Sequence, residues 1–150
     1  LAGDEQFVMD SEIVVDATGE DDVMYLLGNA VSGTDKILIS FSLGLMANRL
    51  YCFVASGKKN DNIAASFFTK IQPWLFKDNE ENKGMTLPRE GIGCWHPIFP
   101  ARLDDVLMLL NTAIKPMEKC VSNKVGSELI VVEKTFDEEN NFTGVRILNQ

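Results

Sequence analysis

A short β-branched run that leads directly into an amphipathic segment constrains the fold of this chain more than any other feature. Residues 12–17 read Glu-Ile-Val-Val-Asp-Ala, and Thr18 and Gly19 follow them. Such a run is typical of a buried parallel strand whose carboxyl end opens into a turn. In residues 20–31, apolar side chains recur at the i, i+3, i+4, i+7 spacing of an amphipathic helix. Thr18 is a candidate cap for this helix, and Glu20 lies in its first turn, where the helix dipole favours negative charge.

Further strands and helices are predicted on both sides of a long irregular stretch. The expected strands cover residues 36–42, 49–56, 128–135 and 145–148, and the expected helices cover residues 62–72 and 103–119. We expect Pro73 to stop the first of these helices, because proline lacks an amide hydrogen. Residues 77–92 show little periodicity and include a charged tract, which predicts a mobile loop. The polar residues 137–141 predict an antiparallel hairpin between the last two strands.

These elements predict a single α/β domain over residues 1–150. The expected architecture is a Rossmann-like, mostly parallel sheet with flanking helices and a C-terminal antiparallel hairpin. Gly91-Ile92-Gly93 lacks the third glycine and the preceding strand of a dinucleotide-binding fingerprint. The chain begins with Leu1 rather than Met, so we expect it to be a piece of a longer protein.

Composition excludes several classes of function. The 150 residues carry a net charge of −8, which argues against non-specific nucleic-acid binding, because that binding depends on Lys and Arg contacts to phosphate. No apolar run reaches the roughly 18 residues that span a bilayer, so no membrane association is expected. The three cysteines, Cys52, Cys94 and Cys120, are odd in number and not closely paired, which predicts reduced thiols and a cytoplasmic protein.

The segment of residues 93–100, Gly-Cys-Trp-His-Pro-Ile-Phe-Pro, holds the only histidine of the chain two residues from a cysteine. A thiol near an imidazole is the minimum for a nucleophilic cysteine, because the thiolate is the reactive form. In one interpretation Cys94 is a nucleophile and His96 lowers its pKa. In the other, Cys94 is a small buried residue and His96 bonds to the backbone of its loop. Two such ligands are too few for a metal site.

Two stretches of the chain resemble the ThiF/MoeB-like adenylating domain of ubiquitin-activating enzymes and their bacterial relatives. Residues 16–20, Asp-Ala-Thr-Gly-Glu, stand where the family has Asp-Cys-(Thr/Ser)-Asp-Asn between a strand and a helix. Cys94 precedes the apolar helix of residues 103–115, where the family has a cysteine on a crossover segment. The resemblance covers residues 10–120. It implies the second half of such a domain, because the family's glycine-rich ATP loop lies before the Asp-bearing strand.

The resemblance implies ATP-dependent adenylation of the C-terminal carboxylate of a ubiquitin-like or sulfur-carrier protein, with a thioester step at Cys94. It implies ATP and Mg²⁺ as cofactors, with Asp16, Thr18 and Glu20 as candidate binding residues. Gly19 stands in place of the family's metal-binding aspartate, and Glu20 beside it is the candidate replacement. The family's Cys-x-x-Cys zinc ligands are absent, so no structural zinc is expected. A homodimer is expected from the family.

Two alternatives stay open on the sequence alone. Asp16 either helps to position a nucleotide or Mg²⁺, or it is a turn residue that caps the helix together with Thr18. The chain as a whole is either part of an adenylating enzyme or a non-catalytic binding or dimerisation module with the same fold.

Overall fold

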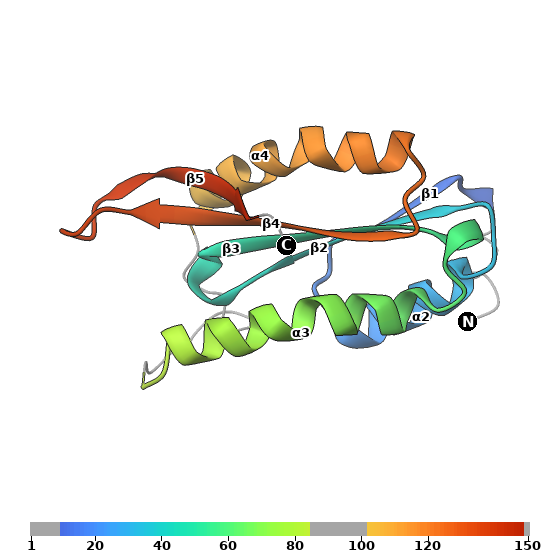
Figure 1. Ribbon diagram of the computed structural model, residues 1–150, viewed down its shortest axis with the longest axis horizontal. Helices are drawn as coiled ribbons and strands as arrows, with labels where there is room; N and C mark the ends of the chain where they lie inside the picture. The colour runs from blue at the N-terminus through green and yellow to red at the C-terminus, as the bar shows by residue number, and fades with distance from the viewer. Residues whose placement is uncertain (1–9, 85–101, 149–150) are drawn as a thin grey trace.

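The computed structural model describes residues 10–84 and 102–148 and shows one five-stranded sheet covered by helices on both faces (Figure 1). The strands lie side by side in chain order: β1 (Ile13–Asp16), β2 (Ile37–Leu43), β3 (Arg49–Ser56), β4 (Ser127–Phe136) and β5 (Phe142–Leu148). The helices are α2 (Asp21–Val31), α3 (Ile63–Glu81) and α4 (Leu103–Ser122), with short 3₁₀ turns at Leu45–Ala47 and Gly57–Lys59. Helices α2 and α3 lie on one face, and α4 lies on the other. None of the described helices is both long enough and apolar enough to cross a bilayer.

The sheet is mixed, so the prediction of a mostly parallel, Rossmann-like sheet is wrong. Among the described strands only β1 and β2 pair in parallel, and β2 to β5 form an antiparallel meander. The reason lies in the connections. Only residues 44–48 join β2 to β3, too few for the crossover that parallel strands need. Between β3 and β4 the chain forms α3 on one face of the sheet and α4 on the other, and β4 then runs antiparallel to β3. The predicted C-terminal antiparallel hairpin of β4 and β5 is confirmed.

Helix α3 continues through Pro73 to Glu81, so the predicted end of this helix at Pro73 is wrong. Trp74 packs against the core, and Asp78, one turn later, is only 3% exposed. These contacts outweigh the hydrogen bond that proline removes, because tertiary packing supplies most helical stability in proteins. The first residues of the predicted loop 77–92 are therefore helical up to Glu81, while residues 85–92 lie outside the described part of the chain.

Strand β3 is the centre of the core, and all eight of its residues are buried. Tyr51 and Phe53 point towards α2 and α3, whereas Cys52 and Val54 point towards α4. This alternation is the period of two of a strand, and it lets one strand serve two separate apolar layers. Cys52 is fully buried in the layer that faces α4.

Gly57 allows the backbone directly after β3 to lie against the end of α2, because it has no Cβ atom. A Cβ atom on Gly57 would collide with the backbone carbonyl oxygen of Val31 and would lie 2.9 Å from that of Thr34. The Gly57 amide also donates to the Lys36 carbonyl at 2.9 Å, so the backbone cannot withdraw without breaking this bond. Only glycine fits this approach of two backbone segments.

We predict that Gly57→Ala lowers the free energy of unfolding by about 3 kcal/mol, because overpacking against backbone forces the segments apart. Gly126→Ala is the matched control, since a Cβ there meets its nearest neighbour at an ordinary 3.5 Å. Urea denaturation of the two variants measures the difference. Equal stabilities would show that the contact at Gly57 is not tight.

Candidate functional site

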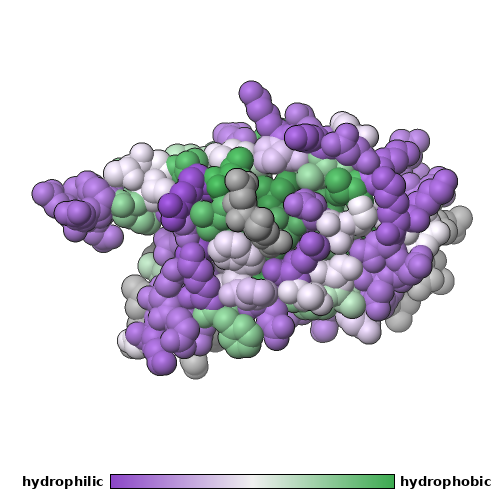
Figure 2. Space-filling view, viewed as in Figure 1, coloured by the Kyte–Doolittle hydropathy of each residue, from purple (hydrophilic) through white to green (hydrophobic). Residues whose placement is uncertain are grey.

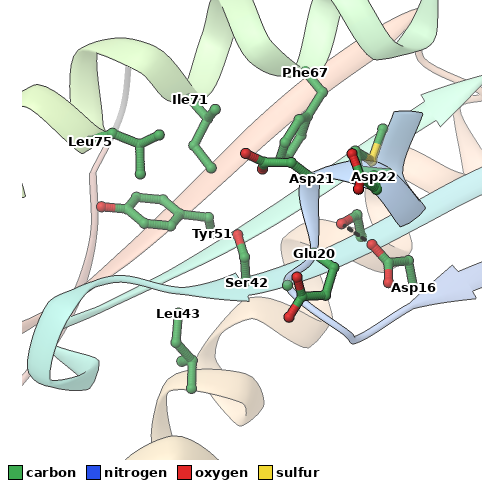
Figure 3. Close-up of a pocket in the computed structure, with 13 residues that line it drawn as sticks. Asp16, Glu20, Asp21, Asp22, Ser42, Leu43, Tyr51, Phe67, Ile71 and Leu75 are labelled. Carbon is green, nitrogen blue, oxygen red and sulfur yellow. Dashed lines mark hydrogen bonds between the residues drawn. The ribbon is translucent and has the colours of Figure 1, made fainter. Parts of the chain in front are cut away.

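A cleft of about 380 Å³ opens between α2 and α3 at the carboxyl end of β1 (Figure 3). The first turn of α2 and the end of β1 supply carboxylates, β2 supplies Ser40, Ser42 and Leu43, and α3 supplies apolar side chains. Because β1 and β2 are parallel, their carboxyl ends meet at the same edge of the sheet. Open α/β sheets bind their ligands in this position, so the cleft is the candidate functional site.

Asp16 is buried at the end of β1 and is held by neutral donors. Its Oδ1 accepts from the Thr18 amide at 2.9 Å and from the Thr18 hydroxyl at 2.7 Å, and its Oδ2 accepts from the Ser40 hydroxyl at 3.0 Å. This geometry confirms that Asp16 organises the turn. The carboxylate also lines the cleft, so a role in ligand binding stays a prediction.

The cap of helix α2 differs from the predicted one. Glu20 is the N-cap residue and makes no side-chain cap bond, so Thr18 as the cap is wrong. Thr18 lies two residues earlier, where its hydroxyl accepts from the Glu20 amide at 3.2 Å. The turn between them passes through Gly19, whose φ of +69° lies in the left-handed region that glycine adopts without strain. The exposed Glu20 carboxylate also lines the cleft.

The cleft residues suit Mg²⁺ better than phosphate. Mg²⁺ is usually bound by one or two carboxylates together with waters and substrate phosphates, and Asp16 and Glu20 offer that set. No cluster of three or more His, Cys, Asp or Glu side chains that could hold a metal by itself occurs in the described residues. The described lining of the cleft also includes no Lys or Arg. Cations for a polyphosphate would therefore come from elsewhere.

A second, smaller cavity of about 190 Å³ shares three residues with the cleft, namely Gly19, Ser42 and Leu43. Val106 and Leu110 of α4 line it, so it lies on the opposite face of the sheet. The ends of β1 and β2 thus separate an acidic cleft from an apolar cavity.

Beyond the cleft, a buried ion network fastens the end of α3 to the sheet. Arg49, at the start of β3, is 3% exposed and forms ion pairs with Asp78 and Glu133. Its guanidinium also reaches Glu81 at 2.6 Å, and Asp78 accepts from the Tyr51 hydroxyl at 2.6 Å. Because Tyr51 lines the cleft, the network joins the cleft wall to the last turns of α3.

Protonation in this network follows from its packing. Burial by itself would lower the pKa of Arg49, but hydrogen bonds to Glu81, Glu133 and Asp78 outweigh it and raise that pKa. Burial would raise the pKa of Glu133, yet hydrogen bonds from Arg146 and Arg49 leave it lowered. Burial, together with the bond to Asp78, raises the pKa of Tyr51. The arginine and Glu133 are thus held charged and the phenol neutral.

Sequence reasoning missed this network. The run around Asp78 and Glu81 has the composition of a solvated loop, and Arg49 is the first residue of a predicted strand, a position that many surface residues occupy. The one available signal is the helical spacing that continues beyond Pro73, with Trp74 and Asp78 four residues apart.

The predicted catalytic pair, Cys94 and His96, lies outside the described residues. Of the cysteines that are described, Cys52 has its pKa raised to about 12, mainly by burial. Burial also raises the pKa of Cys120, and the charge of Glu128 adds to the shift. Neither thiol has the lowered pKa of a nucleophile.

A known protein is similar in sequence to most of this chain. No protein-family model matches the chain. The chain is 34% identical over 113 residues to the ATP-dependent ubiquitin transferase-like protein Cap2 of Enterobacter hormaechei subsp. hoffmannii (strain UCI 50). The match covers 74% of this chain but only 18% of that relative. This similarity supports a relationship with ubiquitin-activating-like proteins. The matched residues correspond to a small part of the relative's length.

Loss of the central arginine should destabilise the fold strongly. We predict that Arg49→Met lowers the free energy of unfolding by about 3–5 kcal/mol, because it leaves the buried Asp78 without its cation and takes from Glu133 one of its partners, while Arg146 still pairs with Glu133. Lys83→Met removes an exposed ion pair with Glu80 and should change stability by less than about 1 kcal/mol. Chemical denaturation compares the two, and a small effect of Arg49→Met would contradict the network.

Thiol reactivity should separate the three cysteines. In the folded protein we expect iodoacetamide to alkylate Cys52 at least about 100-fold more slowly than in the urea-unfolded protein, because its thiol is buried and protonated. Site-resolved mass spectrometry measures all three rates at once, and the unfolded protein is the control. Rapid labelling of Cys52 in the folded protein would contradict the buried core position. Rapid labelling of Cys94 is the result that the nucleophile hypothesis requires.

Proposed function

We propose that this chain is part of a ubiquitin-activating-like enzyme that uses ATP to adenylate the C-terminal carboxylate of a ubiquitin-like or sulfur-carrier protein. The observation that carries the proposal is the similarity to Cap2. The buried carboxylate of Asp16 supports it, because Asp16 lines the cleft at the carboxyl ends of β1 and β2, where open α/β sheets generally bind their ligands. The chain spans about a fifth of the length of the relative, so the activity belongs to the whole protein.

Strand β1, at the side of the described sheet, supports the further proposal that the chain is the second part of an adenylating domain. Strand β1 pairs only with β2 among the described strands, and Ile13 and Val15 are 45% and 58% exposed. An apolar edge strand is a template for another strand. Because β1 already pairs in parallel, it suits further parallel strands from the preceding part of the protein.

In the proposed reaction, an oxygen of the partner's carboxylate attacks the α-phosphorus of ATP, and the bond to pyrophosphate breaks. Asp16 and Glu20 would hold the Mg²⁺ that accompanies the nucleotide, while Thr18 and Ser40 keep the Asp16 carboxylate oriented. Mg²⁺ supplies charge neutralisation at the phosphates. In a second step, the Cys94 thiolate attacks the acyl carbon and AMP leaves, with His96 favouring the thiolate. A homodimer and a cytoplasmic location complete the proposal.

One observation favours a second candidate function, a non-catalytic binding or dimerisation module. Gly19 replaces the aspartate of the resembled motif, and its left-handed backbone disfavours most other side chains. In this candidate the cleft binds a partner without chemistry.

ATP–pyrophosphate exchange by the full-length protein with ubiquitin-like partners separates the candidates. We predict that Asp16→Asn, which keeps the shape of the side chain, lowers exchange about 10–100-fold, because it weakens Mg²⁺ binding. Glu138→Gln, in the distant β4–β5 turn, is the charge-matched control and should retain exchange. Cys94→Ser should retain exchange but lose the thioester. Absence of exchange with every partner would contradict the enzyme and favour the binding module.

A further inference from the structure

Three of the described residues that line the cleft carry hydroxyl groups, and two of these hydroxyls already have acceptors. Ser40 donates to Asp16 Oδ2 at 3.0 Å, and Tyr51 donates to Asp78 Oδ2 at 2.6 Å. The third, Ser42, has a buried hydroxyl oxygen with no hydrogen-bond partner among the described residues. The other side chains of the described lining are carboxylates and apolar groups, which donate no hydrogen bond at neutral pH. Ser42 is therefore the one uncommitted side-chain donor of the described cleft lining.

The position of Ser42 directs this donor into the cleft. Ser42 follows Ser40 by two residues on β2, so both side chains lie on the same face of the sheet, about 7 Å apart along the strand. Figure 3 shows the Ser42 hydroxyl directed towards the space below α3. A buried hydroxyl without a partner costs free energy, and native structures rarely keep one without a reason. An acceptor atom of a ligand that extends from Asp16 along the cleft would satisfy it.

The acceptor that this part of the cleft favours is a phosphoryl oxygen. The described lining includes no Lys or Arg, so its own contribution to phosphate binding is limited to neutral donors. The N-cap residue of α2, Glu20, makes no side-chain bond to the amides of the first turn, which leaves these amides open to an anion at the same cleft. Asp21 and Asp22 in that turn are exposed, so solvent and salt screen their charge.

We propose that Ser42 is a catalytic residue of the adenylation reaction, and that its hydroxyl donates to a non-bridging oxygen of the α-phosphoryl group. The inference rests on the proposed function and adds one residue to its site. In the reaction a bond forms between the partner's carboxylate oxygen and the α-phosphorus, and the bond to pyrophosphate breaks, with its electron pair going to pyrophosphate. Ser42 keeps its proton throughout. A donor that is in place beforehand stabilises the charge on the equatorial oxygens of the transition state without reorganisation.

Exchange kinetics with sulfur-substituted nucleotides test this hydrogen bond directly. In each of the two α-thio diastereomers of ATP, sulfur replaces one non-bridging α-oxygen, and sulfur is a weak acceptor. In the full-length protein, Ser42→Ala should lower the kcat of ATP–pyrophosphate exchange about 10–100-fold and change the KM for ATP by less than about 3-fold. The loss should be as large with one diastereomer. With the other, in which the contacted oxygen is already replaced, it should be less than about 3-fold.

Two variants and one stability measurement serve as controls. Ser42→Thr keeps the hydroxyl and should restore the difference between the diastereomers. Ser122→Ala removes an exposed hydroxyl at the end of α4, on the other face of the sheet, and should leave kcat unchanged with all three nucleotides. Ser42→Ala should not lower the melting temperature, since its hydroxyl has no partner to lose in the described fold.

Equal losses of kcat with ATP and with both diastereomers, or no loss at all in Ser42→Ala, would overturn the inference while leaving the proposed function intact. The proposed function fails in a different way. If the unsubstituted protein shows no ATP–pyrophosphate exchange with any ubiquitin-like partner, adenylation is excluded and the role of Ser42 in it is excluded as well.

Discussion

The buried contact of Arg49 with Asp78 and Glu133 is the interaction on which the rest of the structure depends. It joins β3, α3 and β4 at one point, and the side chains of Arg49 and Asp78 are almost completely buried. Charges in such a place are stable only as a paired set, so α3 must continue past Pro73 to deliver Asp78. A helix fixed in this way forms a wall of the cleft, because Phe67, Ile71 and Leu75 lie on the same helix (Figure 3).

Charge and shape divide the cleft into two parts with different chemistry. Asp16 is buried and oriented by hydroxyl groups, whereas Asp21 and Asp22 are exposed beside an apolar floor. On the face shown in Figure 2, hydrophilic residues surround apolar side chains that are visible between the helices and the sheet. The proposed reaction would use such a division, because one of its substrates is an anionic nucleotide and the other is a protein terminus.

The sequence predicted the elements of this fold better than their arrangement. The β-branched run, the Asp16 turn and the C-terminal hairpin are local signals, and each is found in the structure. The predicted burial of the first strand is wrong, because β1 lies at the edge of the described sheet with Ile13 and Val15 exposed. The mostly parallel sheet was wrong because the direction of a strand depends on its connections. The end of α3 was missed because Pro73 and the charges around Asp78 indicate a loop until their partner Arg49, 29 residues away, is known. The link between Asp16 and Ser40 spans 24 residues and has no local signal either.

Hydrogen–deuterium exchange of the full-length protein, with and without MgATP and a ubiquitin-like partner, tests the central claim most directly. If the carboxyl ends of β1 and β2 and the first turn of α2 form the substrate site, residues 16–22 and 40–43 gain protection when both ligands are present, and the hairpin turn at residues 137–141 does not. Protection elsewhere, with none at residues 16–22 and 40–43, would contradict the account.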